Sequence, residues 1–248
     1  MVTPFSSGRT SARRPSGVAG RSVIPLLVAL LLVGLWLARP AADLVARHAG
    51  EDSLASIVLA DPGPCRSARP QLVIPILDVS DSVIGSGGAD PSGRSFDETG
   101  LLAAHLARHP CTTEDRFGMV IFAETTVELE PIPFSSLSVI DAALKRPPAH
   151  EIGSGTSLDR ALDAAAAMAA RFPTHDATVV VLSDMVVEQP AAVRNALSRL
   201  DRSRLHLVAL GDHDAHLDAS FATVTELGDA SSGEVAEALN DAVIDSRR

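Results

Sequence analysis

The sequence predicts an α/β domain built around a mostly parallel β-sheet, and three observations lead to this prediction. Short, unbroken apolar runs alternate along the chain with longer amphipathic segments, as strands and helices do in such a fold. The apolar runs are rich in β-branched residues, which is typical of strands buried on both faces of a parallel sheet. Aromatic residues make up only 3% of the chain, so Ala, Val and Leu have to fill the core. That composition favours helices packed on a sheet over an aromatic-rich sandwich.

Length and charge limit the class of protein. At 248 residues the chain is long enough for one full domain with appended segments. Its formal net charge is −10, but residues 1–39 carry five Arg and no acid, so the remainder carries 16 − 31 = −15. This acidic remainder argues against nucleic acid as a partner. It is compatible with cation binding, although most acidic surfaces only keep a protein soluble.

Three segments precede the predicted domain. Residues 1–21 are rich in Ser, Gly, Pro and Arg and show no apolar period, which is typical of a disordered basic tail. Residues 22–38 are an uncharged apolar run of 17 residues, near the lower limit for a helix that spans a hydrocarbon core of about 30 Å. Residues 39–70 form a linker that several prolines interrupt, with a short helix expected near residues 41–49.

The apolar run is interpreted as a transmembrane signal anchor, and a cleaved signal peptide is the alternative. The apolar region of a signal peptide is about 7–15 residues long. Cleavage after Ala41 would place Arg39 at the third residue before the cleaved bond, and cleavage after Ala42 would place Pro40 there. Both are therefore poor signal-peptide cleavage sites. Four Arg precede the run, which keeps the N-terminus in the cytoplasm and places the acidic domain outside the cell membrane. Cleavage would instead produce a secreted protein.

The two cysteines fit an extracytoplasmic domain. Cys65 and Cys111 are able to form one disulfide in an oxidising compartment. In the chain-entropy model, closing a loop of this size stabilises the fold by about 4 kcal/mol. Two unpaired buried thiols are the alternative, which the sequence leaves open.

Within residues 71–246, the predicted domain, strands and helices alternate. The strands are expected at residues 72–77, 117–122, 178–182 and 205–210, with an exposed edge strand at 125–129 and a weak strand at 221–225. The helices are expected at residues 95–108, 137–144, 158–172, 191–200 and 235–243. Residues 95–98 have the spacing of a capping box that begins the first helix, and residues 83–93 read as an exposed Gly/Ser-rich loop.

Oxygen-bearing side chains follow the ends of two predicted strands. The first apolar run stops at Asp78, and Ser80 and Ser82 follow at alternate positions. The third run ends just before Asp184, and Thr156 lies in the Gly-rich loop before the helix with the clearest apolar stripe. Because open α/β sheets bind ligands beyond the carboxyl ends of their strands, we expect these side chains to lie close together. Small, hard oxygen atoms in such a place suggest a divalent cation.

This arrangement resembles the von Willebrand factor type A domain, which is also found in integrin I domains. Asp78-x-Ser80-x-Ser82 matches the first segment of that family's metal-ion-dependent adhesion site, Thr156 matches its single threonine, and Asp184 matches its later aspartate. The resemblance covers nearly the whole predicted domain and is closest to the membrane-anchored bacterial type. It implies a Rossmann-like fold with helices on both faces of a mostly parallel sheet.

The resemblance also implies how the site works. The hydroxyls of Ser80, Ser82 and Thr156 would bind Mg²⁺ directly, while Asp78 and Asp184 act largely through waters. Mg²⁺ prefers near-octahedral oxygen ligands, and Mn²⁺ suits the same set. Neutral ligands leave the ion net positive with an open position, which the Asp or Glu carboxylate of a partner protein fills. A structural alternative is that Asp78 caps a turn and the two serines satisfy backbone groups.

The expected function is therefore Mg²⁺-dependent protein–protein interaction by a membrane-anchored domain, without catalysis. A Mg²⁺-dependent hydrolase or phosphotransferase is the alternative, since a strand that ends in Asp also begins haloacid-dehalogenase-type sites. Those sites need a second carboxylate where this chain has Ser80, and neither a G-x-x-x-x-G-K-[ST] loop nor a G-x-S-x-G motif occurs. Bacterial relatives also suggest an accessory role beside a chaperone-type AAA+ ATPase, which nothing in the sequence tests.

Some features depart from the family pattern. Met185 follows Asp184 where the family often has Gly, residues 83–97 are longer than the usual step into the first helix, and Asp81 adds a carboxylate in what we expect to be an exposed turn. A second metal site is conceivable but an exposed polar loop is preferred for a cluster of histidines and aspartates, namely His206, Asp212, His213, Asp214, His216 and Asp218.

Overall fold

The computed structural model describes residues 57–65, 67–139, 152–211, 213, 215–228 and 233–247. The predicted tail, the predicted anchor and residues 39–56 of the linker, with its expected short helix, lie outside these residues. Within the described ranges, no helix is both long enough and apolar enough to cross a membrane.

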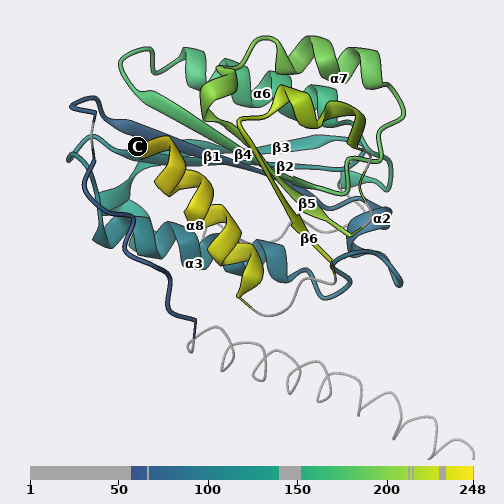
Figure 1. Cartoon of the computed structure of the whole chain (residues 1–248), viewed down its shortest axis with the longest axis horizontal. Coiled ribbons are helices and arrows are strands. Elements are labelled where there is room, and N and C mark those ends of the chain that lie inside the picture. The colour runs from purple at the N-terminus through teal and green to yellow at the C-terminus, as the bar shows by residue number, and fades with distance from the viewer. Residues whose placement is uncertain are drawn as a thin grey trace, which may run out of the picture. The chain divides into compact units, whose positions relative to one another are not determined.

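Six strands form one sheet in the order β3-β2-β1-β4-β5-β6 (Figure 1). All neighbouring strands pair in parallel except β3, which pairs antiparallel with β2. The predicted mostly parallel α/β sheet is therefore confirmed, and β3 occupies the predicted edge position. The strands are β1 (Gln71–Asp78), β2 (Arg116–Phe122), β3 (Thr126–Pro133), β4 (Asp176–Ser183), β5 (Leu205–Leu210) and β6 (Thr223–Leu227).

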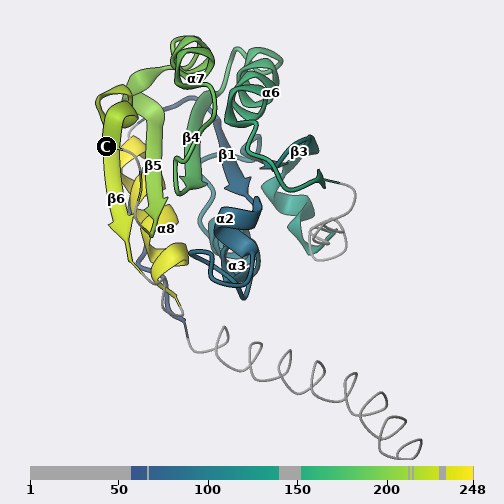
Figure 2. The ribbon, with the colours of Figure 1, turned by 90° about the vertical axis from the view of Figure 1, so that its right-hand side faces the viewer.

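Helices cover both faces of the sheet (Figure 1 and Figure 2). One face is covered by α3 (Arg94–Arg108) and α8 (Glu234–Arg247), and the other by α6 (Leu158–Ala170) and α7 (Pro190–Leu197). These four agree with helices predicted from the apolar stripes. The shorter helical segments are α2 (Asp81–Ile84), η1 (Phe134–Val139), η2 (Arg202–Arg204) and η3 (Ala215–Ser220). η1 overlaps the start of the helix predicted at residues 137–144, most of which lies outside the described residues.

Strand β1 lies at the centre of the sheet, between β2 and β4. Every residue of β1 is buried, because its side chains alternate between two hydrophobic cores. Val73 and Leu77 pack with residues of α3 and α8, whereas Leu72, Ile74 and Ile76 pack with residues of α6 and α7. An unbroken apolar run suits this position, since neither face of the strand meets water.

The predicted capping box at the start of α3 is wrong. The cap is the carboxylate of Asp90, which accepts hydrogen bonds from Arg94 N at 3.0 Å and Ser95 N at 2.8 Å. Glu98, the expected acidic half of the box, is fully buried and accepts instead from two backbone N–H groups at the start of α8, at 2.9 and 3.0 Å. Spacing along the chain predicts the helix, but the groups that the acids cap depend on tertiary packing.

The segment between β1 and α3 is more ordered than the exposed loop predicted at residues 83–93. It begins with the single turn α2, and Val83 is fully buried in the core that also contains α3 and α8. Backbone hydrogen bonds from Ala89 N to Ser82 O (3.2 Å) and from Asp90 N to Val83 O (2.7 Å) fold the segment back on itself. The residues that follow Asp78 are therefore held in a defined conformation.

The predicted disulfide between Cys65 and Cys111 is confirmed, with Cα atoms 5.6 Å apart. It fastens residues 57–65 to the loop before β2. The carbonyl oxygen of Ala60 in this segment accepts a hydrogen bond from Asn240 Nδ2 of α8 at 2.9 Å. This part of the predicted linker is thus packed against the helices of the domain.

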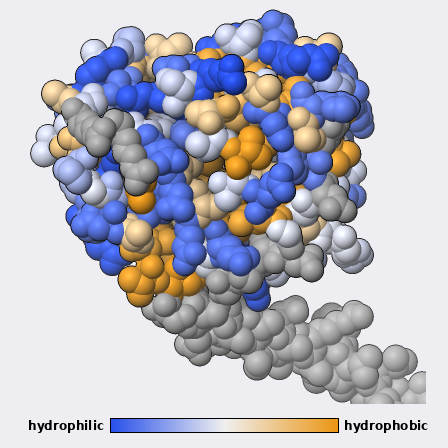
Figure 3. All heavy atoms as spheres, in the orientation of Figure 1, coloured by the Kyte–Doolittle hydropathy of each residue, from blue (hydrophilic) through white to orange (hydrophobic). Residues whose placement is uncertain are grey.

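Hydrophilic residues cover most of the face shown in Figure 3, between small separate groups of hydrophobic residues. Three large hydrophobic side chains of the described residues are exposed, namely Val58, Val127 and Val186. Val186 lies two residues after Asp184 and is 54% exposed.

Candidate functional site

Strands β1 and β4 end side by side at one edge of the sheet. They pair in parallel with Leu77 opposite Leu182, so the next residues, Asp78 and Ser183, lie at the same level. Asp184 follows directly, and its charge is close enough to Asp78 to raise the pKa of that carboxyl. Both aspartates are buried, with only 1% and 5% of their surfaces exposed. The structure therefore brings together the two carboxylates that were predicted to share a site.

The carboxylate of Asp78 is held by two hydrogen bonds. Its Oδ1 accepts from Ser80 N at 2.9 Å, and its Oδ2 accepts from Ser183 Oγ at 2.6 Å. Burial raises the pKa of Asp78 to about 6, the hydrogen bonds from Ser183 and Ser80 oppose the rise, and the nearby Asp184 charge adds to it. A cation beside this carboxylate would favour its charged form.

The hydroxyl groups of Ser80 and Ser82 lie next to each other. Their Oγ atoms are 3.0 Å apart, with Ser80 buried and Ser82 exposed. The turn that aligns them is closed by hydrogen bonds from Val83 N and Ile84 N to Ser80 O, at 3.0 and 2.9 Å. Neighbouring ligands of an octahedral ion with bonds of about 2.0–2.1 Å are about 2.9 Å apart. The separation of the two hydroxyls therefore fits adjacent positions on one Mg²⁺.

Thr156 lies in the loop before α6 and is partly buried. This loop contacts the segments that follow two strands. Asp81 N donates to Ser154 O at 3.4 Å, and Ser157 N donates to Ala123 O at 2.7 Å. The loop of Thr156 is thus held at the same edge as Asp78 and Asp184, so all five predicted site residues belong to segments that meet there.

The turn after β4 contains a residue that the sequence analysis did not assign. Ser183 Oγ donates to Asp78 Oδ2 and accepts from Met185 N at 2.9 Å, so one hydroxyl joins the two strand ends. Met185 has a φ of 56°, in the left-handed region that favours Gly, and its side chain is fully buried. The backbone shape that a Gly would adopt easily is therefore kept despite the Met. Only the position of Ser183 at the end of an apolar run could have indicated its role.

We call the segments that meet here the carboxyl edge. They contain seven Asp or Glu residues and no Lys or Arg, although Arg94 and Arg160 directly follow two of them. This excess of negative charge favours a cation and disfavours a free anion. The segments of the carboxyl edge are residues 78–93, 122–126, 152–159 and 183–189, and their acids are Asp78, Asp81, Asp90, Glu124, Asp159, Asp184 and Glu188.

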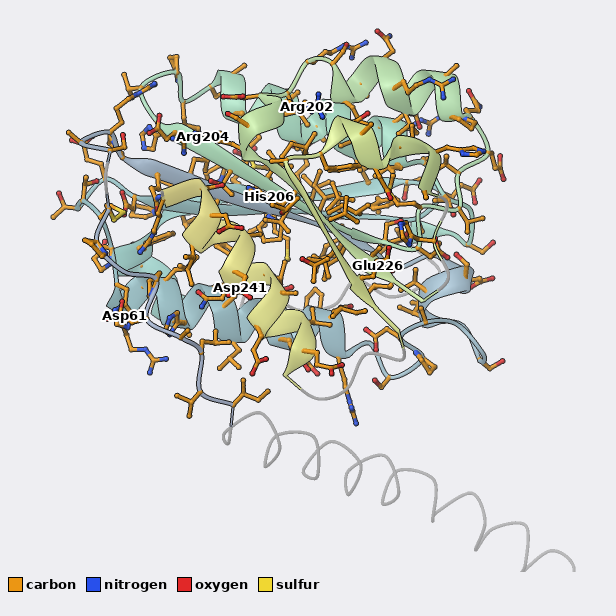
Figure 4. All side chains as sticks on the ribbon, in the orientation of Figure 1. Asp61, Arg202, Arg204, His206, Glu226 and Asp241 are labelled. Atoms are coloured by element: carbon orange, nitrogen blue, oxygen red, sulfur yellow. A yellow bond between two sulfur atoms is a disulfide. The ribbon has the colours of Figure 1, made fainter. Side chains whose placement is uncertain are left out.

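Of the predicted polar loop, His206 is the member that the structure places elsewhere, whereas His216 is exposed and His213 Nε2 lies 3.3 Å from Asp218 Oδ1. His206 is buried on β5 beside α8 (Figure 4), with Nδ1 2.7 Å from Thr223 Oγ1 and Nε2 2.7 Å from Ser246 Oγ. Burial lowers the pKa of His206, which favours the neutral ring. Among the described residues, no group of three or more His, Cys, Asp or Glu side chains could hold a metal, and Asp212 and Asp214 lie outside them.

No family model matches the sequence, and no curated protein matches it. Solved structures do match in fold. A von Willebrand factor type A protein from Catenulispora acidiphila has a TM-score of 0.54 at 16% identity, over 74% of this chain and 44% of that one. The conserved hypothetical protein BatB from Bacteroides thetaiotaomicron has a TM-score of 0.52 at 14% identity, over 70% of this chain and 97% of that one. The pilus adhesin SpaC from Lactobacillus rhamnosus GG has 0.51 at 15% identity, over 75% and 31%.

The fold is that of a von Willebrand factor type A (vWA) domain. At these identities the likeness concerns the fold alone, and this chain spans less than half of the Catenulispora structure. The resemblance expected from the sequence is thus confirmed at the level of the fold. The metal-ion-dependent adhesion site and the membrane anchor stay predictions.

Proposed function

We propose that this chain is a membrane-anchored vWA module that binds a partner protein through Mg²⁺ held at the carboxyl edge. The observation that carries the proposal is the pair of serine hydroxyls, Ser80 Oγ and Ser82 Oγ, 3.0 Å apart beside the buried carboxylates of Asp78 and Asp184. Thr156, from the loop that contacts this turn, would complete the set of protein ligands.

The donor chemistry favours an ion that still binds another ligand. The hydroxyls of Ser80, Ser82 and Thr156 are neutral, so the ion would keep most of its charge and retain a position for a carboxylate. Asp78 and Asp184 would act mainly through waters. The exposed side chain of Val186, next to the site, would give a partner an apolar contact beside the carboxylate. Mn²⁺ would bind the same residues.

Features of the sequence support the proposed location and the proposed binding role. Residues 22–38, which lie outside the described residues, would anchor the chain with the vWA domain on the extracytoplasmic side, and a disulfide is suited to that compartment. A nucleophilic Asp in a haloacid-dehalogenase-type site needs a second carboxylate two residues on, and Ser80 stands there. We therefore propose a binding role in which Mg²⁺ connects two proteins.

A crosslinking pull-down tests the proposal. The full-length chain is used as bait with Mg²⁺ or with a chelator, beside the variants Asp184→Ala and Thr156→Ala and the control Thr174→Ala. Thr174 is an exposed threonine just before β4, at the other end of that strand from Asp184. A partner should be captured by wild type and Thr174→Ala only with Mg²⁺, and by neither site variant. Equal capture by all forms, with and without chelator, would contradict the metal bridge.

A further inference from the structure

The turn after β2 places a carboxylate at the carboxyl edge that the five-residue pattern does not include. Phe122 is the β2 residue in register with Asp78, and Glu124 lies two residues further on. Backbone hydrogen bonds hold the turn on both sides, from Ala123 N to Thr125 O at 3.0 Å and from Val79 N to Phe122 O at 2.9 Å. Glu124 therefore lies at the tip of a tight turn beside the strand that ends in Asp78.

The side chain of Glu124 lies against the loop that carries Thr156. A Cβ atom added to Gly153 would be 2.5 Å from Glu124 Oε2 and 2.6 Å from Glu124 Cβ, and Gly153 itself has a φ of +79°. A Cβ added to Gly155 would be 3.6 Å from Glu124 Cβ. Any side chain at residue 153 would displace the Glu124 carboxylate. Gly153 thus leaves room for Glu124, whereas the distance at Gly155 is an ordinary van der Waals contact.

Among the residues that the structure describes, the carboxylate of Glu124 has no partner that explains its place. The residue is exposed, and among the described residues it makes no hydrogen bond or ion pair. Lys and Arg are absent from all four segments of the carboxyl edge, so those segments offer it no cation. The backbone around it is nevertheless well held, because Thr125 N donates to Ile152 O at 2.9 Å. A carboxylate that pairs with none of the described residues and is carried by a fixed turn is suited to binding an exchangeable ligand rather than to stabilising the fold.

We propose that Glu124 is the chain's own carboxylate for the metal ion, and that it occupies the open position until a partner's carboxylate displaces it. The inference rests on the proposed function, since it needs a metal at Asp78, Ser80, Ser82, Thr156 and Asp184. In the domain without a bound partner, Glu124 then raises the affinity for the ion. It also competes with the partner's carboxylate for the open position on that ion. Only a carboxylate that binds better than Glu124, through added contacts at the rim, replaces it.

Mn²⁺ binding by the full-length chain tests this role. The affinity is obtained by titration with detection of free Mn²⁺ by electron paramagnetic resonance, and the number of waters on the bound ion from water-proton relaxation. Glu124→Ala and Glu124→Gln are compared with Glu188→Ala and Glu188→Gln, because Glu188 is an exposed acid of the same edge. Both pairs of variants remove one negative charge from the carboxyl edge. A difference in Mn²⁺ binding between the two pairs therefore depends on where the carboxylate lies and not on the charge alone.

The expected result is Mn²⁺ affinity about tenfold weaker for Glu124→Ala, with about one more water on the bound ion. For the Glu188 variants a change of no more than about twofold is expected at ordinary salt. Equal effects of the Glu124 and Glu188 variants, with unchanged hydration, would overturn the assignment of Glu124. Asp184→Ala keeps the two proposals apart. If Asp184→Ala binds Mn²⁺ as wild type does, the proposed metal site itself is wrong. If Asp184→Ala loses Mn²⁺ binding while Glu124→Ala binds Mn²⁺ with the affinity of wild type, the assignment of Glu124 alone is refuted.

Discussion

The two ends of the central strands differ in how their charges are balanced. The carboxyl edge has seven acids and no Lys or Arg, whereas the amino edge, at the start of the same strands, has four Arg and four acids. Asp176 at the start of β4 is paired on both sides, with Oδ1 3.2 Å from Arg69 Nη1 and Oδ2 3.1 Å from Arg204 Nη2. The segments of the amino edge are residues 67–71, 111–116, 173–177 and 201–205.

The amino edge satisfies its buried polar groups from within the chain. Gln71 N donates to Asp115 Oδ1 at 2.9 Å, and Arg247 Nε donates to Gln71 Oε1 at 2.9 Å. The disulfide closes the same end of the sheet. At the carboxyl edge, Asp78 and Asp184 are buried near each other without a basic side chain in the neighbouring segments. We therefore expect the amino edge to contribute stability that is independent of metal, and the carboxyl edge to contribute stability that depends on it.

The largest expected effect is at the amino edge. Replacing both cysteines, Cys65→Ser with Cys111→Ser, removes a cross-link between residues 46 positions apart, and should lower the free energy of unfolding by about 4 kcal/mol. The loss should be the same with Mg²⁺ and with chelator, because the link is far along the strands from the carboxyl edge. Urea unfolding of the full-length chain, followed by circular dichroism, measures it. A loss of stability that appeared only without Mg²⁺ would contradict the expectation that the amino edge stabilises the fold independently of metal.

A pH effect of about 3 kcal/mol is expected at the carboxyl edge in the absence of metal. Burial raises the pKa of Asp78 to about 6, from about 4 in the unfolded chain, so the folded state binds more protons between these values. The free energy of unfolding should therefore fall by about 3 kcal/mol from this group as the pH rises from about 4 to about 6. Urea titrations in chelator should show this fall in wild type and lack it in Asp78→Asn. Glu98, whose pKa is also raised by burial, contributes equally to both proteins.

Mg²⁺ should stabilise the folded chain at neutral pH. A ligand present at one hundred times its Kd raises the free energy of unfolding by about 2.7 kcal/mol. The increase should disappear in Thr156→Ala and persist in Thr174→Ala, since only the first lies at the carboxyl edge. Thermal unfolding at increasing Mg²⁺ concentrations is the measurement, and an equal rise in both variants would point to binding elsewhere.

The smallest expected effect concerns the turn that carries Asp184. Met185 is fully buried and has a positive φ, so both Met185→Ala and Met185→Gly lose core contacts. Glycine alone relieves the left-handed backbone, by about 1 kcal/mol. This relief offsets the usual disadvantage of Gly, about 0.5–1 kcal/mol relative to Ala, so Met185→Gly should be at least as stable as Met185→Ala. The midpoints of urea unfolding of the two variants, measured in chelator, test this prediction. If Met185→Ala were the more stable of the two, the turn would be unstrained.

Much of the candidate site could be predicted because it is encoded locally. Asp78, Ser80 and Ser82 follow one apolar run, and in a parallel sheet the ends of neighbouring strands meet at one edge. The remainder depends on contacts between distant residues. The bond from Ser183 to Asp78 spans 105 positions, and the bond from Gly233 N to Glu98 spans 135. His206, which looked like part of a polar loop, is buried because α8 packs over β5.

The sequence by itself determined the alternation of strands and helices, the parallel sheet and the segments that carry the five site residues, because periodicity and strand ends are local properties. Only the tertiary structure decided which side chains pair with or contact each other. It paired Arg69 and Arg204 with Asp176, joined Cys65 to Cys111, and placed Glu124 over Gly153. Charge balance is a sum over everything within a few ångströms, so it appears only when the chain is folded.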